Sequence, residues 1–216
     1  MKERGKIEKE LLSQGYSLVG VDEVGRGCIA GPVFAACVAL DYEELERLSD
    51  GQRHLIRDSK KLSAAQRAGI LPTIRQISRE AYIAMADVKE IETLGIVPAT
   101  FKAMRRALKL CEQPYSMLLI DGNQPLANYY GEQTQVIGGD QLCYAIAAAS
   151  ILAKEARDTY MQQQAQKYPD YGFESHVGYG TKAHIESIHK IGICPLHRKN
   201  FAPIKHMVNQ PGSPTP

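Results

Sequence analysis

The stretch SLVGVDEVGRGCIAGPVFAACVAL, residues 17–40, decides the fold of this chain. Its first part, Ser17–Asp22, carries β-branched residues and predicts a strand. Its last part, Pro32–Leu40, predicts a second and more apolar strand. Because only a short glycine-rich turn around Gly25-Arg26-Gly27 joins them, we expect the two strands to pair antiparallel.

The sequence on either side of this stretch predicts alternating helices and strands. The expected elements are, in chain order, a short amphipathic helix (1–15), the two strands above, a polar irregular segment (41–62), a helix that begins with a Ser63–Gln66 capping box and is interrupted or kinked at Leu71-Pro72, a third strand (80–88), a helical segment with a weak point at 95–98 (90–111), strands at 116–120 and 133–137, a long alanine-rich helix (141–167) and a helix at 181–190. This order predicts an α/β fold with a mixed central β-sheet flanked by helices and a C-terminal helical extension.

Length and composition indicate an ordinary globular protein. Of the 216 residues, 44% are hydrophobic and 23% charged, which suits a single packed core. We expect one catalytic domain over residues 1–208 and a disordered tail over 209–216, where the sequence NQPGSPTP has little apolar content. No apolar run approaches the roughly 20 residues of a membrane span, so no membrane partner is expected.

Cysteine usage bears on the compartment. The five cysteines are odd in number and irregularly spaced, and Met1–Gly15 is charged, without the apolar core of a secretory signal. We therefore expect reduced thiols in a cytoplasmic protein. The protein is also expected to be a monomer. Cys194 and His197 have metal-ligand spacing but lack a second pair, so no zinc site is predicted there.

Charge is distributed unevenly along the chain. The formal net charge is only +2, but the segment His176–His206 holds five Lys or Arg residues against one acid, Glu186. A locally basic segment on a near-neutral chain is compatible with a face that meets an anion and, equally, with a solvated surface.

Four acids stand at the expected ends of strands. Asp22 and Glu23 end the first strand, Asp121 ends the strand at 116–120, and Asp140 follows two glycines after the strand at 133–137. Carboxylates gathered in one place repel one another, and a hard divalent cation, Mg²⁺ or Mn²⁺, compensates for that charge. Two such ions about 3.5–4 Å apart can activate water and stabilise the leaving oxygen in phosphodiester hydrolysis. Taken singly, Asp121 and Asp140 fit turn-forming aspartates better, but the consecutive acids after the first strand weaken that interpretation.

The segment 25–30, GRGCIA, also matches the G-x-G-x-x-G/A pattern of dinucleotide-binding proteins. Two features argue against an oxidoreductase. The residues that follow predict a strand, so no helix N-terminus is available for a pyrophosphate. Asp22 and Glu23 would also place negative charge beside that pyrophosphate.

Five ordered blocks resemble the ribonuclease HII family. They are Gly20–Gly27 (GVDEVGRG) continuing to Ala30–Val33 (AGPV); Asp58–Leu62 (DSKKL); Leu119–Asn123 (LIDGN); Gly139-Asp140 with Ala148–Lys154 (AASILAK) and Arg157-Asp158; and His176 with Gly178–Thr181 (GYGT), His184, His197-Arg198 and Phe201. The resemblance spans residues 19 to about 203, and five blocks in order are far more specific than one motif. Arginine between the two glycines at 25–27 favours type 2 over type 3.

The resemblance implies an RNase H-like fold and cleavage of RNA in RNA–DNA hybrids. It also implies incision on the 5′ side of single ribonucleotides in duplex DNA, leaving a 3′-hydroxyl and a 5′-phosphate. By motif, Asp22, Glu23, Asp121 and Asp140 would be the metal-binding catalytic acids. The turn of Gly25, Arg26 and Gly27 would recognise the ribose 2′-hydroxyl, and Tyr179 would stack on the sugar that follows the ribonucleotide.

Several basic residues are candidate substrate contacts. Lys60, Lys61 and Lys182 are expected to meet phosphates or to be solvated surface lysines, and Arg198 to meet the nucleic-acid backbone or to be structural. His184 and His197 are open between acid–base chemistry and packing.

The chain also departs from the family pattern. Lysine is usual at Val177, alanine at Val24 and serine at Asn200, while Glu92 and Gly95 stand where Asp and Asn are usual. The missing lysine at 177 keeps open an alternative function, a non-catalytic hybrid-binding protein of the same fold.

Overall fold

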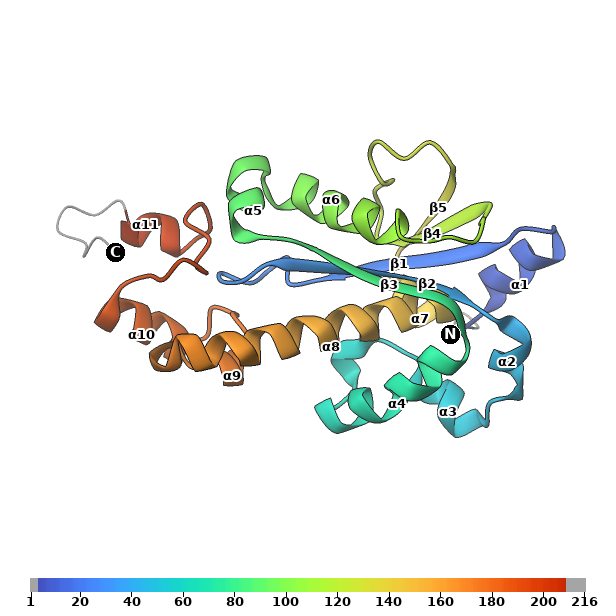
Figure 1. The fold of residues 1–216 in the computed structure, drawn as a ribbon, viewed down its shortest axis with the longest axis horizontal. Coiled ribbons are helices and arrows are strands. Elements are labelled where there is room, and N and C mark those ends of the chain that lie inside the picture. The colour runs from blue at the N-terminus through green and yellow to red at the C-terminus, as the bar shows by residue number, and fades with distance from the viewer. Residues whose placement is uncertain (1–3, 209–216) are drawn as a thin grey trace.

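The computed structural model describes residues 4–208, which form a five-stranded mixed sheet covered by helices on both faces (Figure 1). The strands lie in the order β3-β2-β1-β4-β5. Their bounds are Leu18–Val24 (β1), Val33–Leu40 (β2), Ser78–Ala86 (β3), Met117–Asp121 (β4) and Glu132–Val136 (β5).

Strand pairing explains how distant acids come together. β1 pairs antiparallel with β2, as the short turn predicts, and β2 pairs antiparallel with β3. β1 also pairs parallel with β4, and β4 pairs parallel with β5. The carboxyl ends of β1, β4 and β5 therefore lie at one end of the sheet.

The helices connect and cover these strands. In chain order they are α1 (Lys6–Ser13), α2 (Tyr42–Arg47), α3 (Asp50–Leu55), the 3₁₀ helix η1 (Ser59–Lys61), α4 (Ala64–Gln76), α5 (Val88–Leu94), α6 (Ile96–Leu108), α7 (Gly139–Leu142), α8 (Tyr144–Lys167), the 3₁₀ helix η2 (Pro169–Tyr171), α9 (Phe173–His176), α10 (Lys182–Ile191) and α11 (Ile204–Val208).

Helix α8 lies along one face of the sheet, and α6 covers the other (Figure 1). The alanine-rich first half of α8 packs on β1 and β2 in one apolar cluster, and α6 packs on the opposite face in a second. Gly20 in β1 makes the close approach of α8 possible. A Cβ atom there would lie 2.5 Å from the carbonyl carbon of Ala145.

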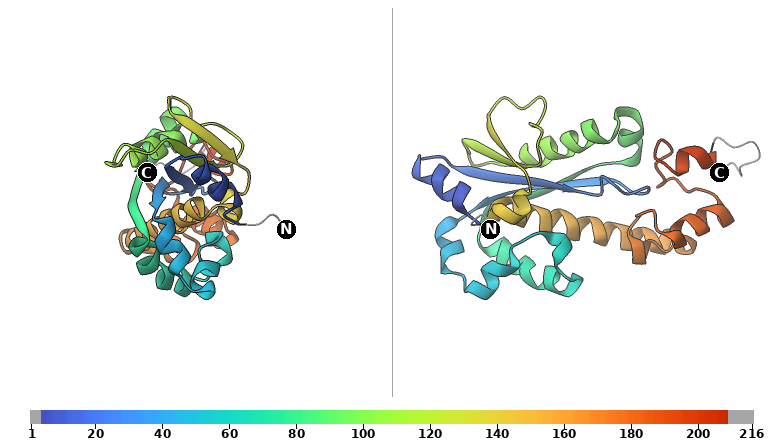
Figure 2. Two further views of the ribbon diagram at one scale, coloured as in Figure 1. Left: turned by 90° about the vertical axis from the view of Figure 1, so that its right-hand side faces the viewer. Right: turned by 180° about the vertical axis from the view of Figure 1, so that it is seen from behind.

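The C-terminal helices form a third apolar cluster at the far end of α8. Phe173 is wholly buried there, with Met161 from α8 and Ile188 from α10 around it. The right-hand view of Figure 2, which shows the molecule from behind, places α10 and α11 (red) beyond the end of the sheet. This is the predicted C-terminal helical extension.

The structure corrects some expected elements and confirms others. The segment 41–62 is not irregular, because it holds α2, α3 and η1, and the long helix is divided at Cys143 into α7 and α8. Helix α4 has the predicted capping box at Ser63 and continues through Pro72. The break expected at 95–98 falls at Gly95, between α5 and α6.

The predicted tail 209–216 lies outside the described residues. Within residues 4–208, no helix is both long enough and apolar enough to cross a membrane.

Candidate active site

The parallel pairing of β1 with β4 brings the first and third predicted acids together. Val21 pairs with Ile120, so Asp22 and Asp121 are the next residues at the carboxyl ends of two adjacent strands. The Gly139 amide then donates a hydrogen bond of 2.7 Å to Asp121 Oδ1, which places Asp140 beside the same strand end. Three acids that lie far apart in the sequence are thus held at one site by the backbone.

The acids differ in exposure. Asp22 is 5% exposed and Asp140 9%, whereas Glu23 and Asp121 are partly exposed. Asp22 Oδ1 accepts a hydrogen bond from the Glu23 backbone amide at 2.7 Å, and the nearby Ser150 hydroxyl from α8 favours the ionised form of Asp22. Arg26 Nη1 lies 3.1 Å from Glu23 Oε1 at the rim of the site.

Burial and mutual repulsion raise the pKa values of these carboxyls. Burial raises the pKa of Asp22 well above its usual range, and the charges of Glu23 and Asp121 act in the same direction. Burial also raises the pKa of Glu23, although Arg26 opposes the shift. The pKa of Asp140 rises to about 6 because the group is buried and lies near Asp58 and Asp121.

Such a site fits a divalent cation. Neighbouring negative charges make it harder for these carboxyl groups to lose their protons, and a bound hard cation offsets that repulsion. Carboxylate oxygens are ligands that suit Mg²⁺ or Mn²⁺. Within residues 4–208, no three His, Cys, Asp or Glu side chains are grouped closely enough to hold a metal ion. Mg²⁺ usually keeps several waters and is bound by one or two carboxylates plus substrate phosphate, so an incomplete protein ligand set is compatible with it.

The two glycines of the turn after β1 differ in whether the surrounding protein leaves room for a side chain. Gly25 has a φ of +94°, and a Cβ there would lie 2.2 Å from Arg157 Nε. Gly27 is exposed, and a Cβ there would meet nothing within 4 Å. Protein packing therefore requires glycine at 25 and leaves open space at 27, where a ligand backbone could approach.

The buried position of Arg198 favours the structural one of the two roles that the sequence left open. Its side chain is wholly buried, and its guanidinium donates to the carbonyl oxygens of Gly31 (2.9 Å), Arg26 (3.1 Å) and Gly25 (2.8 Å). Arg198 therefore holds the 25–27 turn from the interior of the protein. Of the two arginines, Arg26 and Arg198, only Arg26 is exposed.

Arg157 is a supporting residue that the sequence did not single out. It is wholly buried in α8 and donates to the carbonyl oxygens of Pro32, Val177 and Ala30 at 2.8–3.1 Å. It thus connects the segment after the 25–27 turn to the segment before Tyr179. Its place in the fourth sequence block was the available signal, but two of its three contacts, Pro32 and Ala30, lie more than 100 positions away in the sequence.

Tyr179 is held in place by neutral histidines. His184 Nδ1 lies 2.8 Å from the Tyr179 carbonyl oxygen, and His184 Nε2 lies 3.0 Å from His197 Nε2. Because the Cys194 amide donates to His197 Nδ1 at 2.9 Å, one pattern satisfies all three contacts: His197 donates to His184, which donates to Tyr179. Burial lowers the pKa of both histidines to about 4, and their ring nitrogens are used in these contacts, which favours the packing role for both.

The predicted lysines occupy different places. Exposed Lys60 lies near the acids, since its charge lowers the pKa of Glu23 and Asp140. Lys61 Nζ lies 3.4 Å from Gln141 Oε1. Lys182 begins α10, is highly exposed and lies 3.7 Å from Glu186.

Asp58 is a further acid at the site that sequence reasoning did not select. It is 7% exposed, caps η1 and lies close enough to Asp140 to raise the pKa of that carboxyl. Its position at the head of the second block was the signal for it.

Two residues that depart from the family pattern contact each other: the Asn200 side-chain amide donates to the Glu92 backbone carbonyl at 3.1 Å.

Comparison with known proteins gives the same family throughout. A family model described as Ribonuclease HII matches residues 19–204. The ribonuclease HII of Synechococcus sp. (strain CC9902) is 46% identical over 192 residues, which cover 89% of this chain and 95% of that protein. The ribonuclease HII of Caldicellulosiruptor bescii is 44% identical over 197 residues, covering 91% and 92%.

Solved structures share the architecture. The ribonuclease H2 from Pyrococcus horikoshii OT3 matches with a TM-score of 0.72 at 23% identity, covering 88% of this chain and 95% of that one. The Bst ribonuclease HIII in complex with Mn²⁺ matches with a TM-score of 0.65 at 17% identity, covering 88% and 68%. At such identities the likeness establishes the fold, which is RNase H-like as predicted.

Proposed function

Because the chain belongs to the ribonuclease HII family, we propose that it incises duplex DNA on the 5′ side of single embedded ribonucleotides as well as cleaving RNA in RNA–DNA hybrids. The products would be a 3′-hydroxyl and a 5′-phosphate. Membership of the family makes the chain a nuclease of the ribonuclease H class. The observation that carries the finer proposal is the position of Asp22 and Asp121 at the ends of adjacent parallel strands, beside a turn with open space at Gly27.

In this proposal Asp22, Glu23, Asp121 and Asp140 hold the divalent cations on which the family depends. Two Mg²⁺ or Mn²⁺ ions, when bound, supply an activated water and neutralise the charge that develops on the leaving oxygen. The chain itself concentrates negative charge at one strand end and shields it from water on the α8 side. Lys60 lies close enough to favour the ionised form of Glu23 and Asp140, and it can also meet a substrate phosphate.

Substrate choice would rest on the 25–27 turn and on Tyr179. The 2′-hydroxyl distinguishes a ribonucleotide from a deoxyribonucleotide, and backbone groups of the turn could approach it closely because Gly27 carries no side chain. Arg198 and Arg157 hold this turn and the Tyr179 segment in fixed positions. Tyr179 is 38% exposed and could therefore stack on the sugar that follows the ribonucleotide.

Parallel reactions on three duplexes test the proposal. One duplex carries a single ribonucleotide, one is entirely DNA, and one carries a 2′-O-methyl ribonucleotide at the same position. With Mg²⁺ or Mn²⁺ we expect incision of the first only. Incision of all three at similar rates would contradict recognition of the 2′-hydroxyl.

A non-catalytic hybrid-binding protein of the same fold remains the second candidate, and Val177 is the feature that favours it. Val177 stands where the family usually has lysine, and its own carbonyl is used structurally by Arg157. Retained binding of the ribonucleotide duplex without incision under either metal would support this candidate. The four acids at one strand end favour catalysis instead.

A further inference from the structure

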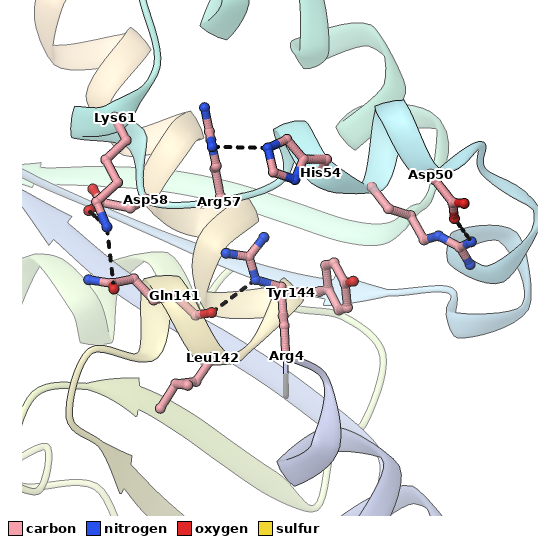
Figure 3. A pocket seen from close by; sticks show the side chains of 10 residues that line it. Arg4, Asp50, His54, Arg57, Asp58, Lys61, Gln141, Leu142 and Tyr144 are labelled. Atoms are coloured by element: carbon pink, nitrogen blue, oxygen red, sulfur yellow. Dashed lines mark hydrogen bonds and ion pairs between the residues drawn. The ribbon is translucent and has the colours of Figure 1, made fainter. Parts of the chain in front are cut away.

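A cleft next to the four acids has no role in the function proposed above. Its volume is about 730 Å³, and it lies between α3, η1, α7 and the residues that precede α1 (Figure 3). Four cationic side chains line it: Arg4, Arg53, Arg57 and Lys61. We call it the basic cleft.

The basic cleft carries more positive than negative charge. Its carboxylates, Asp50 and Asp58, lie 2.5 Å from Arg53 Nη2 and 3.8 Å from Lys61 Nζ. Among residues 4–208, Arg4 and Arg57 have no ion-pair partner. Arg4 donates to backbone carbonyl oxygens, and Arg57 Nη1 lies 3.1 Å from the His54 ring (Figure 3).

These two guanidinium groups are also partly withdrawn from water. Arg57 Nε is buried and, within the described part of the chain, has no hydrogen-bond partner. Burial lowers the pKa of Arg4 and the nearby charge of Arg57 acts in the same direction, whereas the charges of Asp140 and Glu8 oppose the shift. Two partly buried cations that repel each other and have no carboxylate within ion-pair distance are stabilised when an anion joins them.

Helix α8 shows where the cleft lies relative to the acids. The cleft adjoins Asp140, because Gln141 and Leu142, which follow it, both line the cleft. Tyr144 in the first turn of α8 also lines the cleft, Ser150 lies beside the Asp22 carboxyl, and Lys154 Nζ lies 6.0 Å from the centre of the Tyr179 ring. At a rise of 1.5 Å per residue, Asp22 is level with a point on α8 roughly 9 Å from the cleft and roughly 6 Å from the Tyr179 level, and so lies between them along the helix.

We propose that the basic cleft binds phosphates of the cleaved strand on the 5′ side of the scissile bond. The inference rests on the proposed function, in which Tyr179 contacts the nucleotide on the 3′ side of the ribonucleotide and cleavage occurs on its 5′ side. The strand then passes from Tyr179 across the acids and reaches the cleft with its 5′ portion. Because the cleft adjoins Asp140 and lies roughly 9 Å from the level of Asp22 along α8, it would hold phosphates within the first three positions upstream of the scissile bond.

Binding measurements with trimmed duplexes test this placement. The protein carries Asp121→Asn to prevent cleavage, and dissociation constants are measured by fluorescence anisotropy over a salt series. One duplex extends 15 base pairs on both sides of a single ribonucleotide, a second ends one base pair upstream of it, and a third ends one base pair downstream. Arg57→Ala is compared with Arg79→Ala, which removes an exposed, ion-paired arginine at the start of β3.

We expect Arg57→Ala to weaken binding of the long duplex about fivefold and to reduce the salt slope by about one. The same loss is expected on the downstream-trimmed duplex and almost none on the upstream-trimmed one. Arg57→Lys should restore the slope, because it restores the charge. Arg79→Ala should leave all three dissociation constants unchanged.

Three results would overturn the proposal: an Arg57→Ala effect no larger than that of Arg79→Ala, equal losses on both trimmed duplexes, or a loss confined to the upstream-trimmed one. If Arg57→Ala does not fold by circular dichroism, Arg53→Gln in the same cleft gives the same comparison. Cleavage by the unaltered protein is assayed in parallel. Failure to incise would refute the proposed nuclease, while the trimmed duplexes would still decide the cleft.

Discussion

Replacing Asp140 with asparagine is expected to stabilise the protein in the absence of divalent cations. The pKa of Asp140 rises from its ordinary 3.8 to about 6 in the folded state, because the carboxyl is buried near Asp58 and Asp121. The folded protein therefore binds a proton more tightly than the unfolded chain between pH 4 and 6. Stability linked to this group is present below pH 4 and lost as the pH rises through 6.

The size of this effect follows from the shift. At about 1.4 kcal/mol per pKa unit, ionised Asp140 destabilises the metal-free fold at pH 7.5 by at most about 3 kcal/mol, and sharing of charge with Asp58 reduces this to about 2 kcal/mol. For a chain of this length, the variant should melt about 4–8 °C higher than the unaltered protein. Urea unfolding in EDTA at pH 4, 5, 6 and 7.5 measures the difference directly.

Metal should reverse the order of stability. A cation at 100 times its dissociation constant stabilises the unaltered protein by about 2.7 kcal/mol, and the variant should gain much less. Asp170→Asn, at an exposed acid in η2, is the matched control and should change neither curve. A variant that is less stable in EDTA at pH 7.5, or a difference that does not grow between pH 4 and 7.5, would refute the reasoning.

Three further predictions concern the fold that holds the site. Gly20→Ala should destabilise the protein by about 1–3 kcal/mol in urea unfolding, because the new Cβ would lie 2.5 Å from Ala145. Gly69→Ala, where α4 leaves open space, should stabilise it by about 0.5–1 kcal/mol. Equal effects would contradict the packing account. Arg157→Lys should cost at least about 2 kcal/mol, since one ammonium cannot replace a guanidinium that serves three carbonyl groups, and a neutral result would argue against its bracing role. His184 and His197 have pKa values lowered to about 4, so their contribution to the free energy of unfolding should be complete above pH 6.5 and fall by about 3 kcal/mol for each histidine as the pH drops to 4. This loss of stability in acid should be smaller in His197→Gln and unchanged in His189→Gln, which alters an exposed histidine.

The sequence predicted the elements whose signals are local. The β1–β2 hairpin follows from two apolar runs joined by a short turn, and the capping box at Ser63 is present as expected. The segment 41–62 was wrongly expected to be irregular, because α2 and α3 have only six residues each and show no apolar periodicity. Their caps at Asp41 and Ser49 were the only signals.

Features that depend on distant residues could not be predicted in the same way. The parallel pairing of β1 with β4 joins residues about 100 positions apart and leaves no local pattern. Charged side chains are rarely buried, so the sequence did not predict the complete burial of Arg157 and Arg198. It is explained by the backbone carbonyl oxygens that accept hydrogen bonds from their guanidinium groups. The catalytic and substrate roles of the site residues, the single domain over 1–208, the monomer and the cytoplasmic location stay predictions.

Mapping of the cleavage site on duplex DNA with one ribonucleotide tests the central claim most directly. With Mg²⁺ or Mn²⁺, the account predicts one cut on the 5′ side of the ribonucleotide, with a 3′-hydroxyl and a 5′-phosphate. Asp121→Asn should lower the rate by at least about a hundredfold while keeping the folded state. A cut at another position, or wild-type turnover by folded Asp121→Asn, would contradict it.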